Sequence, residues 1–314
     1  AGPPTVPYLL SVCDGTEVWA GPPADFNFAS LEGAELVSHN SAFDEEISLA
    51  AAERGEFQIP GLQPYDMPNW HCSMNMAAYL FNVRSLAESV KVGLGIDVNK
   101  GVRDRAKGKL PEDMKKEGWW DDMVLYAKLD AQHCFHLWEK HNSKWPVFER
   151  RLSRLTIDQG RYGVRIDVPA LRRGIELLSK VIFRATQNLP WIARGNKPAS
   201  PIGIAEECRL VGIPPPPVKA HDPEAAEAWE TEYAPKHKFV LALRNIRKAK
   251  KTKATLETIL LRLREDDTVA FSLKYAGAHT LRFAGDSGWN LQNMNKEPLF
   301  VDSEFSFVFD PKAC

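Results

Sequence analysis

Short apolar runs alternate with longer amphipathic segments over the first 145 residues of the chain. Apolar residues stand on both sides of Asp14-Gly15 in "YLLSVCDGTEVWAG", which predicts two strands joined by a tight turn. A third run, "GAELVSHN", ends at polar residues and predicts a strand leading into a helix that begins at about Ser41. Residues 74–90 and 120–141 have helical spacing. This mixture predicts an α/β unit that ends near residue 145.

The pattern after this unit is mainly helical. "LSRLTIDQGRYGVRIDVPALRRGIELLSKVIFRA" predicts a helix, a turn around Gly160 and Gly163, and a second helix capped near Asp167. "GIPPPPVKAHDPE" is rich in Pro and predicts an extended connector. Apolar residues at helical intervals predict a pair of long helices over 236–264, and the Gly-rich sequence that follows predicts strands and loops.

The composition is that of an ordinary soluble globular protein, with 44% hydrophobic and 26% charged residues among 314. No apolar run approaches the roughly 20 residues of a membrane span, so we expect no membrane partner. The five Cys are scattered and odd in number, which favours a reducing compartment over a disulfide framework. The chain opens without Met and enters a strand-like run at once, which suggests a trimmed chain.

Charge is distributed very unevenly, although the net charge is only −1. Between Lys236 and Arg264 stand ten Lys or Arg and a single acid, Glu257. The segment just before it, Asp222 to Glu232, contains five acids and no base. The neutral total therefore hides a strong local positive field, of the kind that attracts polyanions.

Two small groups of polar residues are candidates for chemistry. Asp44 lies in the first turn of its predicted helix, where an acid is favoured by the exposed N–H groups and where Asn40 or Ser41 can cap the helix. Tyr126 and Asp130 are four residues apart and share one helix face. Each group has an ordinary structural explanation when taken separately. A phenol and a carboxylate on one face can also hold a metal and orient a water.

Together, the two groups resemble the 3′–5′ proofreading exonucleases of the DEDD class, in the variant with a tyrosine. The second motif of that class is similar to Asn40-Ser41-Ala42-Phe43-Asp44, and the third is similar to Tyr126-Ala127-Lys128-Leu129-Asp130. The resemblance implies a ribonuclease H-like fold and a site with two Mg²⁺ or Mn²⁺ ions. It also implies that Asp130 and Asp44 ligate metal, while Tyr126 positions the attacking water. Asn40 and Phe43 complete the implied catalytic set.

The first motif of that class, an acid-x-acid pair on one strand face, has no clear counterpart. The acids of Asp14-Gly15-Thr16-Glu17 are three apart and fall on opposite faces of a strand, so a hairpin turn explains them better. In the layout of the class this hairpin would form the second and third strands, and the first strand would lie upstream of Ala1. Zinc is another alternative, because "HCFHLWEKH" offers several ligands, but their spacing is looser than in structural zinc sites.

The rest of the chain resembles family A DNA polymerases, in the phage type. "FVLALRNIRKAKKTKATLETIL" resembles the thumb, and "LKYAGAHTLRFAGDSGWNLQNM" resembles the stretch that enters the palm. Leu281 stands where the family usually has Gly, Ala284 stands where Ser is usual, and Arg282 is kept. The resemblance implies DNA contacts from twelve residues: Arg244, Arg247, Lys248, Lys250, Lys251, Lys253, His279, Thr280, Arg282, Asn290, Gln292 and Asn293.

The implied domains are an exonuclease-like domain over 1–148, connecting helices and a basic thumb over 149–270, and the start of a palm over 271–314. No fingers helix follows, and the sequence around Asp310 does not resemble the first polymerase carboxylate motif. We therefore expect a portion of a DNA polymerase that binds primer–template DNA and a single-stranded 3′ end. A separate palm and fingers chain is a candidate partner, and a bacterial cytoplasm is the expected location if a phage encodes it.

Two other functions stay open on the sequence. A non-catalytic DNA-binding subunit would keep the fold and lack metal ligands. An RNA-trimming nuclease of the same exonuclease class would explain residues 1–145, but it would leave "YAGAHTLRF" without an explanation.

Overall fold

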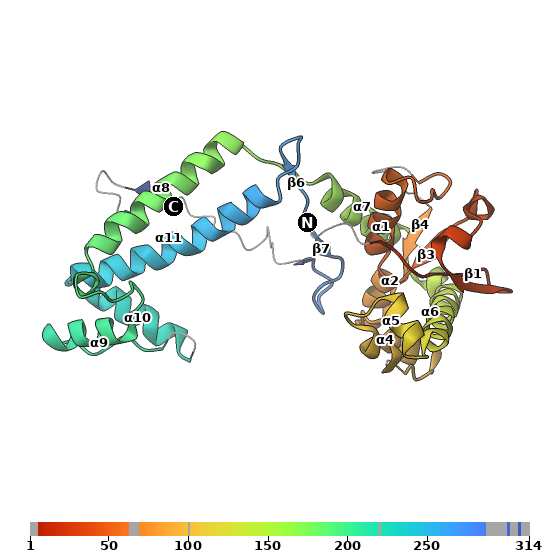
Figure 1. Cartoon of the computed structure of the whole chain (residues 1–314), viewed down its shortest axis with the longest axis horizontal. Coiled ribbons are helices and arrows are strands. Elements are labelled where there is room, and N and C mark those ends of the chain that lie inside the picture. Colours follow the sequence, from red (N-terminus) through yellow and green to blue (C-terminus); the bar gives the residue numbers. More distant parts are fainter. Residues whose placement is uncertain are drawn as a thin grey trace. The chain divides into compact units, whose positions relative to one another are not determined.

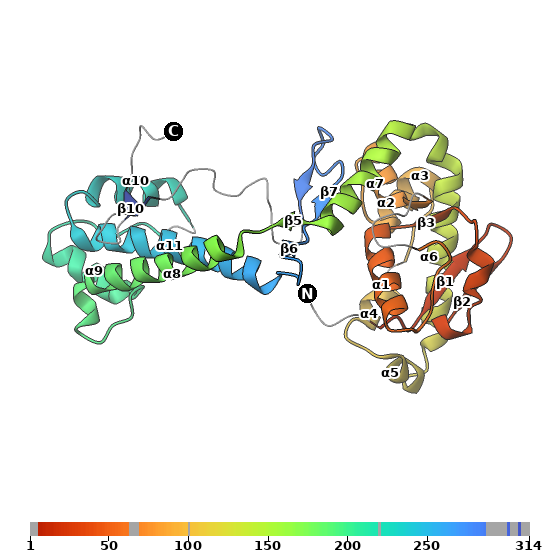
Figure 2. The same cartoon turned by 90° about the horizontal axis from the view of Figure 1, so that it is seen from above.

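The computed structural model describes residues 6–62, 69–99, 101–218, 221–286, 300–301 and 307–308. These residues are mostly helical and carry small two-stranded sheets, so the fold is of the mixed α/β type (Figures 1 and 2). None of the helices within these ranges is long and apolar enough to cross a membrane. The chain divides into two compact units: unit 1 is Ala1–Gly163 with Ala270–Met294, and unit 2 is Val164–Val269 with Asn295–Cys314.

Unit 1 surrounds short strands with helices. Its strands are β1 (Leu10–Cys13), β2 (Val18–Gly21), β3 (Leu36–Ser38), β4 (Trp70–Cys72), β7 (Leu273–Lys274) and β8 (Ala284–Gly285). Its α-helices are α1 (Ser41–Glu53), α2 (Ser73–Phe81), α3 (Leu86–Leu94), α4 (Gly101–Ala106), α5 (Pro111–Lys116), α6 (Trp120–His141) and α7 (Val147–Tyr162). Short 3₁₀ turns lie at Pro23–Asp25, Phe28–Leu31 and Asn142–Lys144.

The predicted N-terminal hairpin is confirmed. Strands β1 and β2 pair antiparallel, and the Asp14 N–H donates to the Glu17 carbonyl at 3.3 Å. The Asp14 carboxylate accepts from the backbone N–H groups of Thr16 and Glu17 at 2.8 and 2.7 Å. These hydrogen bonds, that from Glu17 foremost, lower the pKa of Asp14 to about 2. Asp14 therefore stabilises its own turn, as the three-residue separation of the acids indicated.

The strand that leads into the helix at Ser41 is also confirmed, but the predicted cap is wrong. Strand β3 pairs in parallel with β4 and is followed by α1. Asn40 occupies the N-cap position in the left-handed region, with φ 85°, and its side chain makes no capping hydrogen bond. The backbone makes the turn instead, because the Phe43 N–H donates to the Asn40 carbonyl at 2.9 Å. Asn adopts this conformation more readily than most residues.

The single helix predicted over 74–90 is two helices. Helix α2 ends at Asn82, whose φ of 56° is left-handed and stops the helix, and α3 begins after Ser85. The Ser85 hydroxyl accepts from the Glu88 N–H at 3.3 Å and caps α3. The helix predicted over 120–141 is confirmed as α6. Strands β1, β2 and β3 all pack against α6, which makes it the central support of unit 1.

Residues 270–286 return to unit 1 and pack on α7. Tyr275 is buried in a core that includes Trp145, whose ring N–H donates to the Tyr275 hydroxyl at 3.3 Å. The Phe271 N–H donates to the Gly160 carbonyl at 3.0 Å, and a Cβ on Gly160 would lie 2.5 Å from the Phe271 carbonyl oxygen. Gly160 thus lies inside α7 as a close-approach residue. Of the two glycines expected in the turn, Gly163 is the one that ends the helix, with φ 82°.

Unit 2 is built on two long helices. Its α-helices are α8 (Val168–Gln187), α9 (Pro201–Leu210), α10 (Pro223–Tyr233) and α11 (Lys238–Leu261), with a 3₁₀ turn at Pro190–Ile192. Its strands are β5 (Val164–Arg165), β6 (Thr268–Val269), β9 (Phe300–Val301) and β10 (Phe307–Val308). The pair of helices predicted over 236–264 is wrong, because α11 continues without a break over most of that range.

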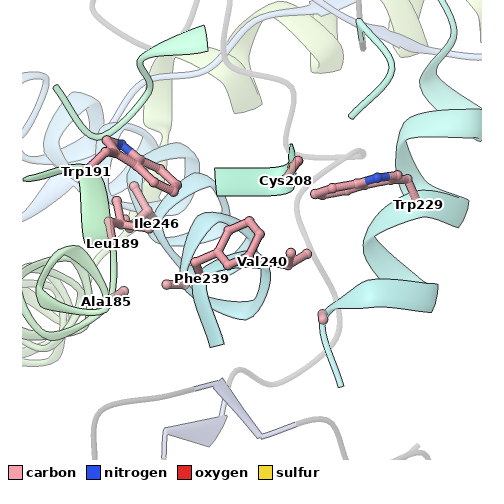
Figure 3. Packing of buried hydrophobic residues seen from close by; sticks show 10 residues of the cluster. Ala185, Leu189, Trp191, Cys208, Trp229, Phe239, Val240 and Ile246 are labelled. Atoms are coloured by element: carbon pink, nitrogen blue, oxygen red, sulfur yellow. The ribbon is translucent and has the colours of Figure 1, made fainter. Parts of the chain in front are cut away.

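Helices α8 and α11 run side by side in opposite directions along unit 2 (Figures 1 and 2). The predicted cap of α8 is confirmed, since the Asp167 carboxylate accepts from the Ala170 N–H at 2.9 Å. Buried apolar residues fill the end of unit 2 where α9 and α10 join the long helices (Figure 3). Trp191 and Phe239 contact each other there, with ring centroids 6.0 Å apart. This core fixes α10 against α11.

Candidate functional site

Asp44 lies where the strand β3 meets the helix α1, and it is half-buried. Burial is the main reason that its pKa is raised to about 6, and the nearby charge of Glu45 raises it further. A hydrogen bond with Ser38, at the end of β3, acts in the opposite direction. Asp44 is therefore a carboxylate whose ionised form the protein does not stabilise well. A cation bound beside it would supply that stabilisation.

Tyr126 and Asp130 form a second group on α6. They are one helical turn apart and share a side-chain hydrogen bond, which lowers the pKa of Asp130 while burial, the larger effect, raises it. Burial and the Asp130 charge raise the pKa of Tyr126 to about 12, so the phenol keeps its proton at neutral pH. The positive charge of Arg103 on α4 also acts on both side chains. The phenol O–H thus donates to the carboxylate.

The negative charges of Asp44 and Asp130 both affect the pKa of one buried thiol, that of Cys134 on α6. Burial raises the pKa of Cys134 to about 12, and the negative charges of Asp44 and Asp130 contribute to the increase. Ser73 lies 3.3 Å from the Cys134 sulfur and 3.0 Å from His39 Nδ1. Two half-buried carboxylates, far apart in the sequence and carried by α1 and α6, thus both influence one thiol electrostatically. Cys134 is inert as a nucleophile, because its thiolate is strongly disfavoured.

The donors of this site are hard oxygens, which suit Mg²⁺ better than zinc. Within the ranges that the structure describes, no group of three His, Cys, Asp or Glu side chains is arranged to hold a metal. Asp44 and Asp130 supply oxygen donors of the kind that Mg²⁺ prefers. Two histidines of α6 have other surroundings: His141 Nε2 lies 3.0 Å from the Gly93 carbonyl, and His136 is exposed. His133 interacts electrostatically with Asp130. The zinc alternative receives no support from these residues.

Phe43 is an exposed apolar side chain in the first turn of α1. Its side chain is 53% exposed and directly precedes Asp44. Asn40 sits one helical turn earlier, in the left-handed conformation described above. An exposed aromatic ring next to a half-buried carboxylate offers a surface on which a nucleobase can stack. The roles predicted for Asn40 and Phe43 stay predictions.

A buried ion cluster holds α1 in place and was not found from the sequence. Glu45 is fully buried, and its two oxygens accept from Arg154 at 2.7 and 2.9 Å. Arg161 donates to the same carboxylate at 2.8 Å, and Asp158 pairs with Arg154 at 2.7 Å. Both arginines lie on α7, so the cluster fastens α1 to α7. In the sequence Glu45 is only an acid directly after Asp44, and such an acid near a helix start is expected to be exposed to solvent.

The residues of the basic helix α11 that are predicted to contact DNA differ in their exposure and in their ion pairs. Lys250 and Lys251 are exposed. Lys253 lies 3.4 Å from Glu257, one turn further along the helix. Arg247 forms an ion pair with Glu230 of α10. The other two predicted contacts on α11 are half-buried: Arg244 and Lys248.

The segment 273–285 borders a cavity of about 480 Å³ within unit 1. Its lining includes Glu149, Tyr275 and Arg282, and Glu149 accepts a hydrogen bond of 2.5 Å from the Tyr275 hydroxyl. Leu281 has φ 60°, in the left-handed region that favours glycine. His279 and Thr280 are exposed. Four residues considered from the sequence lie outside the described residues: Asn290, Gln292, Asn293 and Asp310.

No protein-family model matches the chain, and no curated protein matches its sequence. Among solved structures, the fold is similar to that of a DNA polymerase domain.

The particular structure is the POL domain of Pol1 from M. smegmatis, solved in complex with a DNA primer-template and a dNTP. The TM-score is 0.58 at 15% sequence identity, and the likeness covers 95% of this chain and 50% of that chain. At this identity the likeness concerns the fold. This chain spans about half the length of the polymerase domain it resembles.

Proposed function

We propose that this chain binds primer–template DNA as part of a family A DNA polymerase, and that it contributes Asp44, Tyr126 and Asp130 to 3′–5′ exonuclease cleavage. The observation that carries the nuclease part is the placement of Asp44 in the first turn of α1, after β3, together with Tyr126 and Asp130 one turn apart on α6 and hydrogen-bonded to each other. The likeness to a polymerase domain solved with primer–template DNA supports the DNA-binding part. The exposed lysines of α11 add to that support.

The chemistry expected of the site is metal-assisted hydrolysis of a phosphodiester. Two divalent ions supply Lewis-acid stabilisation of the attacking and leaving oxygens when they are bound. Asp44 and Asp130 would hold them together with further carboxylates from an acid-x-acid strand. Tyr126 stays protonated, donates its O–H to Asp130 and can accept a hydrogen bond that orients water. The exposed ring of Phe43 would stack on the base at the 3′ end.

A non-catalytic DNA-binding subunit is the second candidate function. The observation in its favour is that the described residues hold no group of three metal-ligating side chains. It differs from the first candidate only in the nuclease step, because both bind DNA through unit 2.

Replacing Asp130 by Ala in a longer chain that carries an acid-x-acid strand before Ala1 tests the proposal. We expect Mg²⁺-dependent trimming of single-stranded and mismatched DNA 3′ ends to be abolished, because a metal ligand is lost. Asp122→Ala is the matched control, since Asp122 is an exposed acid of the same helix. Both variants should bind primer–template DNA like the parent.

Trimming by Asp130→Ala at the parent rate would contradict the nuclease assignment. A parent chain that binds DNA and trims no 3′ end would establish the non-catalytic alternative. Trimming of RNA 3′ ends in preference to DNA ends would favour the RNA nuclease considered from the sequence.

A further inference from the structure

Helices α10 and α11 have opposite charge and pack against each other in unit 2. Helix α10 and its cap contain five acids and no base: Asp222, Glu224, Glu227, Glu230 and Glu232. Helix α11 contains seven Lys or Arg and one acid. A polyanion that approaches α11 therefore meets attraction along most of the helix and repulsion where α10 lies.

Arg247 is a residue of the basic helix α11 that forms an ion pair with the acidic helix α10. Its two terminal nitrogens each contact a different oxygen of Glu230, so the pair is bidentate. The Glu230 side chain is only 10% exposed, so Arg247 is the partner of a carboxylate that is almost removed from water. Breaking such a pair leaves a buried charge uncompensated, which is strongly unfavourable. The Arg247 side chain is itself 42% exposed, and a phosphate that took the two nitrogens paired with Glu230 would have to displace that carboxylate.

The charges further along α11 are placed differently. Lys250 and Lys251 lie about one turn beyond Arg247 and are exposed. Lys253 lies beside Glu257, itself half-exposed, and an exposed pair of this kind costs little to open. The phosphate-binding capacity of α11 is therefore concentrated after Arg247, away from α10.

We propose that duplex DNA contacts α11 through its C-terminal half, from Lys250 onward, and that the acidic helix α10 with the Arg247–Glu230 pair marks the end of this phosphate track. Arg247 is then a structural residue that fastens α10 to α11, and the expectation that it contacts DNA is replaced. This inference rests on the DNA binding proposed above and specifies its surface.

The test is the salt dependence of binding, measured by fluorescence anisotropy of a labelled primer–template duplex with the whole chain. Each phosphate contact contributes a slope of about 0.9 in log K against log salt. Lys250→Gln and Lys251→Gln should each reduce the slope by about this amount. Lys238→Gln is the matched control: an exposed lysine of the same helix at the α10 end, it should leave the slope unchanged.

Arg247 is tested in a double variant, Arg247→Met with Glu230→Leu. Replacing both members of the pair leaves no uncompensated charge at the buried Glu230 position, so the fold should survive, and a thermal melt checks this. The double variant also keeps the net charge, so a change in slope reports a direct phosphate contact and not a change in the overall field. We expect the parent slope.

The outcomes separate the two proposals. A parent chain without salt-dependent DNA binding would overturn the proposed function itself. A normal parent slope that falls in the double variant as much as in Lys250→Gln would overturn only the assignment of Arg247. If Lys238→Gln and Lys250→Gln reduce the salt slope equally, the proposal that DNA contacts only the C-terminal half of α11 is wrong.

Discussion

The two units use charge in opposite ways. Unit 1 buries a few carboxylates: Glu45 is completely enclosed and paired with two arginines, and Asp44 beside it is half-buried and has a raised pKa. Unit 2 places exposed acids on α10, such as Glu224 and Glu227, and exposed lysines on α11, such as Lys250 and Lys251. Inside a protein each charge interacts strongly because the dielectric constant is low, whereas surface charges are weak one by one and are screened by salt.

This difference suits the different tasks proposed for the two units. A site that must hold a metal or orient a water needs a few charges at fixed positions, which burial provides. A surface that follows a duplex needs many interchangeable charges, which exposure provides. Single substitutions should therefore have large effects in unit 1 and small effects in unit 2, apart from the buried Glu230. The three predictions below test this contrast, from the largest expected effect to the smallest.

Glu45→Ala should destabilise the protein by about 3–5 kcal/mol, because it leaves Arg154 and Arg161 without their buried partner. Urea unfolding monitored by tryptophan fluorescence measures the change. The control is Glu46→Ala, an exposed acid of the same helix, which should change the unfolding free energy by less than about 0.5 kcal/mol. If Glu45→Ala and Glu46→Ala lower the unfolding free energy equally, the contrast between buried and exposed charges is wrong.

Asp44→Asn should stabilise the protein at pH 7.5 by about 1–2 kcal/mol, a value reduced for partial exposure from about 1.4 kcal/mol per pKa unit. The folded-state pKa, about 6, lies above the unfolded value of 3.8. The folded chain therefore binds the proton more tightly, and the contribution of Asp44 to stability falls as pH rises from about 4 to 6.

The measurement is the difference in unfolding free energy between Asp44→Asn and the parent at pH 4.5, 6 and 7.5. The difference should grow with pH and then level off. Glu46→Gln, at an exposed acid of the same helix, is the matched control. A flat profile for Asp44→Asn would show that burial does not perturb this carboxyl.

Glu257→Gln should change the stability of the protein by less than about 0.5 kcal/mol, because its pair with Lys253 at 3.4 Å is partly exposed. The small effect should shrink further between 50 and 500 mM salt, at which screening is stronger. Thermal melts at the two salt concentrations measure it. If Glu257→Gln lowers the stability by more than Glu45→Ala is expected to, and salt does not change this loss, then single charges matter more in unit 2 than in unit 1.

The sequence predicts the local elements of this fold well and its long-range contacts poorly. Helix α6 spans the predicted residues because its apolar residues keep helical spacing throughout, and Tyr126 and Asp130 share a face by that spacing alone. The break between α2 and α3 was missed, because it depends on the backbone of one residue, Asn82. The single helix α11 was predicted as two, since its many lysines obscure the apolar pattern.

The ion pairs of the buried carboxylates Glu45 and Glu230 could not be predicted, because no local signal distinguishes a buried charge from an exposed one. Glu45 and Arg154 are 109 residues apart, and Arg247 and Glu230 are 17 apart. In the sequence Arg247 is one of many basic residues of α11 and was therefore expected to contact DNA. The polymerase-like resemblance of the sequence is matched at the level of the fold, while the residues of the nuclease site await measurement.

The discontinuous composition of unit 1 has a consequence for the order in which the protein folds during synthesis. Arg84 donates to the Tyr275 carbonyl across 191 residues, and Trp145 donates to the Tyr275 hydroxyl across 130. Unit 1 is thus completed only after the long helices of unit 2 have left the ribosome. Closing such long loops is slow. We expect α8 and α11 to pair first, although the N-terminal unit is translated first.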